Sequence, residues 1–144
     1  MRFRPIVFSA ACLLCLAGCR TTSSPIVGTW LVKAPEAPFA YHMFIFHSDG
    51  TMQQSNPDAG DRNTSDSSGL GVWTQGADGI RGKFVEVMAD RTTHQFVSRG
   101  EISFVVQVSG DVLKGTASAV FFDAEGRRLR EPVAATLSGQ RILP

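Results

Sequence analysis

The chain has few cysteines, and all of them lie near its start. Cys12, Cys15 and Cys19 are the 3 cysteines of the 144-residue sequence, so residues 20–144 contain no thiol. A thiol nucleophile, a cysteine-based zinc site and a disulfide each require cysteine in the folded part of the chain. The sequence therefore excludes all three from residues 20–144, whose fold must depend on an apolar core.

Excess positive charge is also lacking. The sequence has 14 Lys and Arg residues against 13 Asp and Glu residues, a formal net charge of +1. A nucleic-acid surface requires a clustered basic patch, and only Arg127, Arg128 and Arg130 lie close together. A solvated strand end explains that trio more simply than an acidic partner does. The composition therefore predicts no nucleic-acid partner.

The first apolar stretch is too short for a membrane-spanning helix. It covers residues 6–16 and follows Arg2 and Arg4, a layout typical of an export signal. The next residues, Leu16-Ala17-Gly18-Cys19, resemble the lipobox of bacterial lipoproteins. The resemblance implies cleavage before Cys19, a diacylglycerol thioether on that residue, and a further acyl chain such as palmitate on its new amine.

Three regions follow from this resemblance. Residues 1–18 are expected to be a lipoprotein signal peptide, residues 19–25 a lipidated cysteine and polar tether, and residues 26–144 one folded domain. Because two or more acyl chains hold a protein firmly at a bilayer, the expected partner of Cys19 is a membrane of the bacterial cell envelope. Arg20, where an aspartate tends to retain lipoproteins at the inner membrane, favours the outer membrane facing the periplasm.

The domain carries no pattern typical of an amphipathic helix. Runs rich in Val, Phe, Ile and Thr alternate with short Gly, Asp, Ser and Pro segments, which indicates an all-β fold. Tight turns between the runs predict that strands adjacent in sequence pair antiparallel. The expected strands cover residues 26–33, 40–47, 51–55, 70–75, 82–89, 94–108, 112–122 and 128–138, with one long polar loop at 56–69.

The alternation within the longest runs places apolar side chains on one face. In residues 94–108 that face contains Phe96, Ile102, Phe104 and Val106, as expected for a half-buried strand. Eight such strands form either a sandwich or a closed barrel. The length of the last three runs favours the barrel, because tilted barrel strands are long and closure removes exposed edges. We therefore expect one eight-stranded antiparallel up-and-down barrel.

Residues 26–143 are similar to the lipocalin superfamily. Gly28-Thr29-Trp30 resembles the Gly-x-Trp motif on the first strand of that family, and Arg141 matches the arginine after its last strand. The resemblance implies that Trp30 closes the base of the barrel and that Arg141 lies across it. The domain also looks like small lipocalin-like domains of bacterial secreted proteins, through 46–51 and 71–73.

Candidate chemical sites are weak by comparison. His42 and His47 lie five apart on one expected strand, so their side chains would point to opposite faces, which disfavours a shared metal. His47 with Asp49 could form an acid–base pair, as could Asp90 with His94, but no activated nucleophile accompanies either pair. The 58–66 segment does not fit a calcium-binding EF-hand loop. The sequence thus predicts no catalytic residues, no metal, no cofactor and no enzymatic activity.

Small side chains on the inward face of the strand expected at 112–122, with Gly100 and Ser98 on the strand before it, leave room for a ligand. Gly115, Ala117 and Ala119 would face the barrel interior, so either neighbouring aromatic rings fill that space or a lumen remains. The leading hypothesis is a barrel that binds or carries a small hydrophobic molecule. The residues expected to contact it are Tyr41, Phe44, Phe104, Gly115, Ala117, Ala119 and Phe121.

Two other functions remain open. The protein could be an envelope interaction module that presents the 56–69 loop or the barrel surface to a protein partner, since one long loop among tight turns often carries function. The third hypothesis is a small barrel isomerase or hydrolase that uses His47 and Asp49. It requires both side chains to face one cleft.

Overall fold

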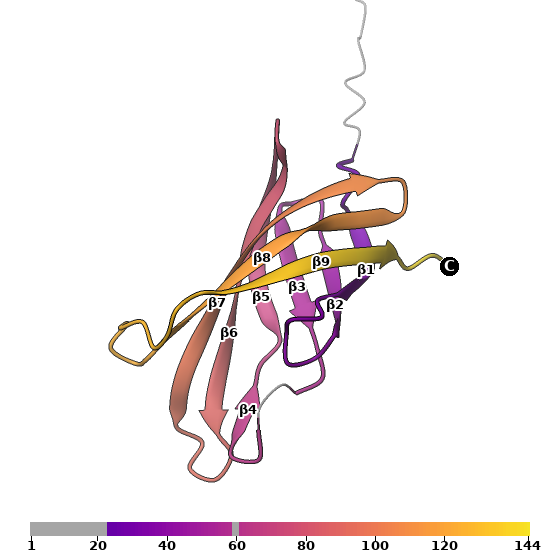
Figure 1. Cartoon of the computed structure of the whole chain (residues 1–144). Coiled ribbons are helices and arrows are strands. Elements are labelled where there is room, and N and C mark those ends of the chain that lie inside the picture. Colours follow the sequence, from indigo (N-terminus) through magenta and orange to yellow (C-terminus); the bar gives the residue numbers. More distant parts are fainter. Residues whose placement is uncertain (1–22, 59–60) are drawn as a thin grey trace, which may run out of the picture.

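A computed structural model describes residues 23–58 and 61–144, and the expected lipid site at Cys19 lies outside these ranges. The described residues form nine β-strands, shown in Figure 1. Their bounds are β1 Gly28–Lys33, β2 Tyr41–Phe46, β3 Thr51–Ser55, β4 Thr64–Asp66, β5 Gly69–Gly76, β6 Gly79–Asp90, β7 Phe96–Ser109, β8 Val112–Phe122 and β9 Val133–Arg141. Within these ranges, no helix has the length and apolar character needed to cross a bilayer.

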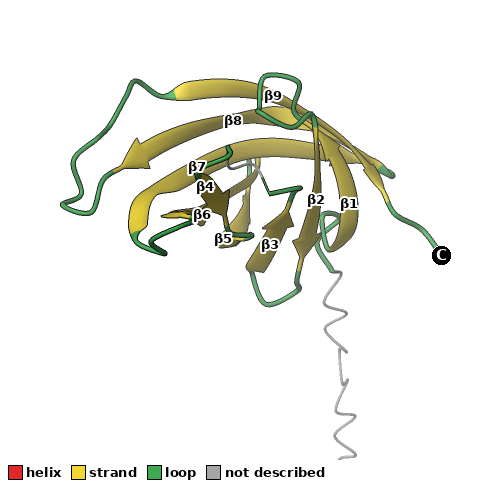
Figure 2. Ribbon diagram, turned by 90° about the horizontal axis from the view of Figure 1, so that it is seen from below, coloured by secondary structure: helices red, strands yellow, loops and turns green. Residues whose placement is uncertain are grey.

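Eight of the strands close into an antiparallel up-and-down barrel, which confirms the expected fold class. The order of pairing is β1-β2-β3-β5-β6-β7-β8-β9, and β9 returns to pair with β1, with Trp30 opposite Arg141. The longest ladder joins β7 to β8 from Arg99↔Phe122 to Ser109↔Val112. The strands follow one another around a ring in Figure 2. Closure pairs both edges of every long strand, as expected for a barrel.

The short strand β4 is an addition to the expected pattern, because the 56–69 segment was expected to be a loop. β4 pairs with β6 through Thr64↔Asp90 and Asp66↔Met88, on the same edge that β5 occupies farther along β6. Between β4 and β5, the Val87 N–H donates to the side-chain hydroxyl of Ser67 at 2.9 Å, while the Ser67 N–H donates to the Val87 carbonyl at 3.0 Å. β4 and β5 therefore act as one strand interrupted by a bulge.

Four expected strands differ from the structure by two residues or more at one end or both: those expected at 26–33, 82–89, 94–108 and 128–138. The last strand was expected at 128–138, but β9 begins at Val133. The reason is Pro132, which has no N–H to donate to a ladder and so favours a position before the strand. The sixth expected strand began at His94, but β7 begins at Phe96, because His94 adopts φ 58° in a turn where its N–H donates to the Asp90 carbonyl.

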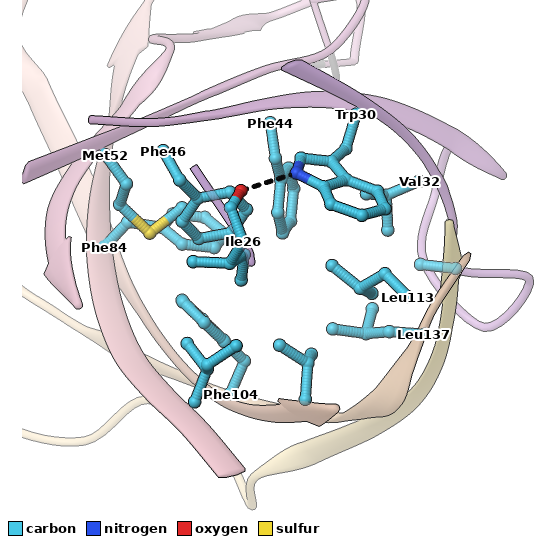
Figure 3. Packing of buried hydrophobic residues seen from close by; sticks show 13 residues of the cluster. Ile26, Trp30, Val32, Phe44, Phe46, Met52, Phe84, Phe104, Leu113 and Leu137 are labelled. Atoms are coloured by element: carbon cyan, nitrogen blue, oxygen red, sulfur yellow. Dashed lines mark hydrogen bonds between the residues drawn. The ribbon is translucent and has the colours of Figure 1, made fainter. Parts of the chain in front are cut away.

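One end of the barrel, the base, is closed by a buried tryptophan. Trp30 is 0 % exposed, and its indole N–H donates to the Ile26 carbonyl at 2.7 Å. Figure 3 shows this bond and the apolar side chains that converge around it. The buried core around the base and middle of the barrel contains Ile26, Val32, Phe44, Phe46, Met52, Ile80, Phe84, Phe104, Val106, Leu113 and Leu137.

Arg141 lies across this tryptophan, with its guanidinium carbon 4.3 Å from the ring centroid. The same guanidinium donates to the Val27 carbonyl at 2.7 Å, to the Pro25 carbonyl, and to the Asp111 carboxylate at 2.9 Å. Gly28 makes room for it, since a Cβ there would lie 2.8 Å from Nη1 of Arg141 and the backbone has φ 130°. A glycine at this position is therefore required by both conformation and close approach.

Candidate functional site

A cavity of about 270 Å³ occupies the half of the barrel away from Trp30. Its lining includes residues from the β1–β2, β3–β4 and β8–β9 connections, which meet at one end because neighbouring strands run antiparallel. We call this end the mouth. The volume is close to the lower limit of the roughly 300–1,000 Å³ typical of small-molecule sites. The barrel thus has a closed base and an internal cavity toward its mouth.

Most of the cavity wall is apolar. Phe44, Phe84 and Phe104 form its floor, and their ring centroids lie 5.7–6.5 Å apart in edge and tilted contacts. The remaining apolar lining consists of Ala34, Ala37, Pro38, Met88, Ile102, Ala117, Ala119, Phe121, Val133, Ala135 and Leu137. Binding of an apolar molecule against such a wall is favourable, because it removes apolar surface of both from water.

A polar wall interrupts this surface on the side formed by β2, β3, β4 and β6. Gln54, 1 % exposed, accepts the Gly69 N–H at 3.1 Å through Oε1, and its Nε2 lies 3.0 Å from Nδ1 of His42. Burial lowers the pKa of His42, an effect that the nearby Phe39 carbonyl only partly offsets. His42 is therefore neutral at pH 7.

Two carboxyl groups, Asp66 of β4 and Glu86 of β6, share a hydrogen bond on the same wall. Burial first, then the charge of Asp66 and this hydrogen bond, raises the pKa of Glu86 from its ordinary value of 4.5 to about 7. Burial and then the charge of Asp58 raise the pKa of Asp66. Hydrogen bonds from the Ser67 backbone and the Glu86 side chain lower it again in part. The pair therefore retains a proton at pH values where exposed carboxyl groups are ionised.

The raised pKa of Glu86 makes the free energy of unfolding depend on pH. Between pH 4.5 and about 7 the folded protein keeps a proton on Glu86 that the unfolded chain has released. The contribution of this proton to the free energy of unfolding is fully present below pH 4.5 and is lost as the pH rises to about 7. Replacing Glu86 with glutamine removes the titration. We expect the E86Q variant to raise the free energy of unfolding at pH 8 by about 1–2 kcal/mol, since one pKa unit is worth about 1.4 kcal/mol before solvent screening.

Urea unfolding at pH 5, 6, 7 and 8 measures this effect. The matched control is Glu101→Gln, because Lys83 and Arg99 lower the pKa of Glu101 and its titration lies below this pH range. An E86Q protein that keeps the wild-type slope of stability between pH 5 and 8 would show that Glu86 ionises normally.

The structure brings together five of the seven residues that the sequence predicted to contact a ligand. Phe44, Phe104, Ala117, Ala119 and Phe121 all line the cavity. Tyr41 does not, because it alternates with His42 and Phe44 on β2 and is 53 % exposed on the outer face beside Lys33. The structure therefore places Tyr41 outside the cavity.

Gly115 is the second predicted residue that does not line the cavity. A Cβ at this position would lie 2.1 Å from the Val105 carbonyl oxygen and 2.7 Å from Cα of Val106. Its small size therefore serves the close approach of β7 to β8, whereas the small size of Ala117 and Ala119 leaves space for the cavity.

His47 and Asp49 lie in the exposed turn between β2 and β3, at the base and away from the cavity. Oδ1 of Asp49 accepts the Thr51 N–H at 2.9 Å and its hydroxyl at 2.7 Å. These bonds, first from the hydroxyl and then from the backbone, lower the pKa of Asp49. The carboxylate thus stabilises the turn, and this geometry does not assemble a cleft around the pair.

Sequence reasoning missed the polar wall, although the alternation contained a signal for it. Gln54 lies two residues after buried Met52, and Glu86 lies two residues after buried Phe84. Because residues two apart on a strand face the same side, both polar side chains are expected to point toward the core. A polar residue at a core-facing position is unusual and marks a site. Asp66 could not be placed this way, because the segment that carries it was expected to be a loop.

Comparisons with protein-family models, curated proteins and solved structures found no match to this chain.

Proposed function

We propose that this protein is a non-enzymatic, lipid-anchored envelope protein whose barrel binds or carries a small hydrophobic molecule. The observation that carries the proposal is the cavity of about 270 Å³, walled largely by phenylalanine, alanine, isoleucine and leucine side chains and closed at one end by the layer around Trp30. Small-molecule sites typically combine such a wall with a few polar groups. The polar wall of His42, Gln54, Asp66 and Glu86 supplies those groups.

The position of the chain start relative to the mouth supports the same proposal. The Pro25 carbonyl is bound by Arg141 at the base, while β4 and the other mouth elements lie at the opposite end in Figure 1. A tether from Cys19 to Pro25 spans at most about 20–25 Å when fully extended. A lipid on Cys19 would therefore hold the base near the membrane and direct the mouth into the aqueous compartment.

Ligand binding is tested by filling the cavity. Ala117 lies on β8 between Phe104 and Ala135, at the middle of the apolar wall. We expect Ala117→Phe to weaken binding of the neutral fluorescent probe N-phenyl-1-naphthylamine at least tenfold, because the new ring occupies the probe's space. Stability should stay within about 1–3 kcal/mol of wild type, since the ring enters a void.

The matched control is Thr116→Phe, which adds the same ring one residue away on the exposed face of β8. Its probe affinity should equal that of the wild type. Absence of probe binding to the wild-type protein, or equal binding by A117F and T116F, would contradict the proposed function.

A further inference from the structure

Two polar atoms on the cavity wall are buried and lack a hydrogen bond within residues 23–58 and 61–144. They are Nε2 of His42 and Oδ1 of Asp66. Both residues line the cavity. Buried polar groups are almost always paired, so each unpaired one requires an explanation, such as a ligand or an ordered water.

The hydrogen-bond network fixes which of these atoms donates. The Gly69 N–H can only donate, so the Gln54 atom that receives it is Oε1, and the Gln54 atom near His42 is the donor Nε2. Nδ1 of His42 must then accept from Gln54, which assigns the proton of the neutral ring to Nε2. The Phe39 carbonyl lies close enough to influence the ring but forms no hydrogen bond with Nε2. The cavity wall therefore offers an N–H donor at His42.

The second atom is an acceptor. Asp66 shares a hydrogen bond with Glu86, and each oxygen of a carboxylate has two lone pairs, so Oδ1 can accept a hydrogen bond from a ligand. These two unpaired atoms thus present one donor and one acceptor, with a predominantly apolar surface beside them.

We propose that, within the ligand site of the proposed function, this pair of atoms binds the head group of an uncharged amphiphile that both accepts and donates a hydrogen bond, namely a primary alcohol or a primary carboxamide. The head group accepts from Nε2 of His42 and donates to Oδ1 of Asp66, while its chain lies against Phe44, Phe84 and Phe104. A hydroxyl or an amide has both functions in one group.

Charged head groups fit this wall less well. A carboxylate would lie against Asp66 and Glu86 and has no proton to donate to Oδ1. An ammonium group has no lone pair to accept from Nε2 of His42. Arg130, the cationic residue of the lining, stacks on Phe121 at the mouth with its guanidinium carbon 4.0 Å from the ring centroid, and it belongs to the opposite side of the cavity from the polar wall.

The volume limits the length of the chain. The cavity of about 270 Å³ lies just below the range of roughly 300–1,000 Å³ typical of small-molecule sites. A single alkyl chain of about ten carbon atoms with a compact head group is therefore the length chosen for the test.

Displacement of N-phenyl-1-naphthylamine from the purified protein tests the inference with ligands matched in length. At pH 7 we expect 1-decanol and decanamide to displace the probe at least tenfold more effectively than decanoate or decylamine. Decanoate or decylamine binding as well as 1-decanol would overturn the inference.

Two variants then test whether His42 and Asp66 bind the head group. His42→Phe and Asp66→Leu should each reduce affinity for 1-decanol about tenfold and leave displacement by decane, which has no head group, unchanged or improved. Tyr41→Phe, on the exposed face of β2 beside His42, should match the wild type in every assay. Circular dichroism and the unchanged affinity for decane confirm that the variants are folded.

The outcomes separate this inference from the function on which it rests. If neither the probe nor decane binds the wild-type protein, the proposed function fails. If both bind but the variants keep the wild-type preference for 1-decanol over decane, the cavity is a ligand site and the assigned head-group contacts are wrong.

Discussion

Replacing Trp30 with alanine is expected to lower the free energy of unfolding by about 3–5 kcal/mol, the cost typical of truncating a buried aromatic side chain. The indole is 0 % exposed, donates to the Ile26 carbonyl and stacks against the Arg141 guanidinium. The substitution removes all three interactions and leaves a cavity at the base. It also leaves the Ile26 carbonyl without its donor, which adds a desolvation cost.

Urea or guanidinium unfolding followed by circular dichroism measures this loss. Leu31→Ala is the matched control, because Leu31 follows Trp30 on β1 but is 43 % exposed on the outer face, where substitutions usually change stability by less than about 0.5 kcal/mol. Equal losses in W30A and L31A would show that Trp30 does not support the base.

Replacing Gly115 with alanine is expected to cost about 3 kcal/mol or more. The added Cβ would lie 2.1 Å from the Val105 carbonyl oxygen and 2.8 Å from Cγ1 of Val106. The first contact is with backbone of the neighbouring strand, which cannot move without disturbing the β7–β8 ladder. Overpacking of this kind commonly costs about 1–3 kcal/mol, and more where no flexible side chain can yield.

The same unfolding experiment with Thr116→Ala provides the comparison, since Thr116 is the next residue on β8 and is exposed. We expect T116A to remain within about 1 kcal/mol of wild type, the span of β-strand propensities. A stable G115A protein with unchanged probe affinity would contradict the close strand approach. A stable protein with lower probe affinity would instead return Gly115 to the cavity wall.

The strand order could be predicted because the sequence constrains it at several levels. Turn residues such as Asp49 and Gly50 force an antiparallel return, and Gly50 adopts φ 86° in that turn. The alternation in 94–108 identified Phe104 and Val106 as core residues, and both are buried. Local turn chemistry and strand period therefore agree with the closed barrel, as is expected of a sequence that specifies one fold.

The candidate site was only partly predictable, for two physical reasons. A small residue has the same appearance in a sequence whether it leaves space, as Ala117 does, or permits close strand contact, as Gly115 does. A three-residue strand such as β4 contains too few positions for an alternation to be recognised, and its placement depends on pairing with distant β6. The polar wall depends on that long-range pairing.

The contacts of Arg141 also determine where a reporter can be attached. Through one side chain the last residue of β9 holds the backbone of Val27 and Pro25, so the entry to the first strand and the exit from the last are neighbours. A fluorescent protein fused after residue 144 would emerge on the same side of the barrel as Pro25. Such a fusion would report on the location of the protein in cells and leave the mouth of the barrel uncovered.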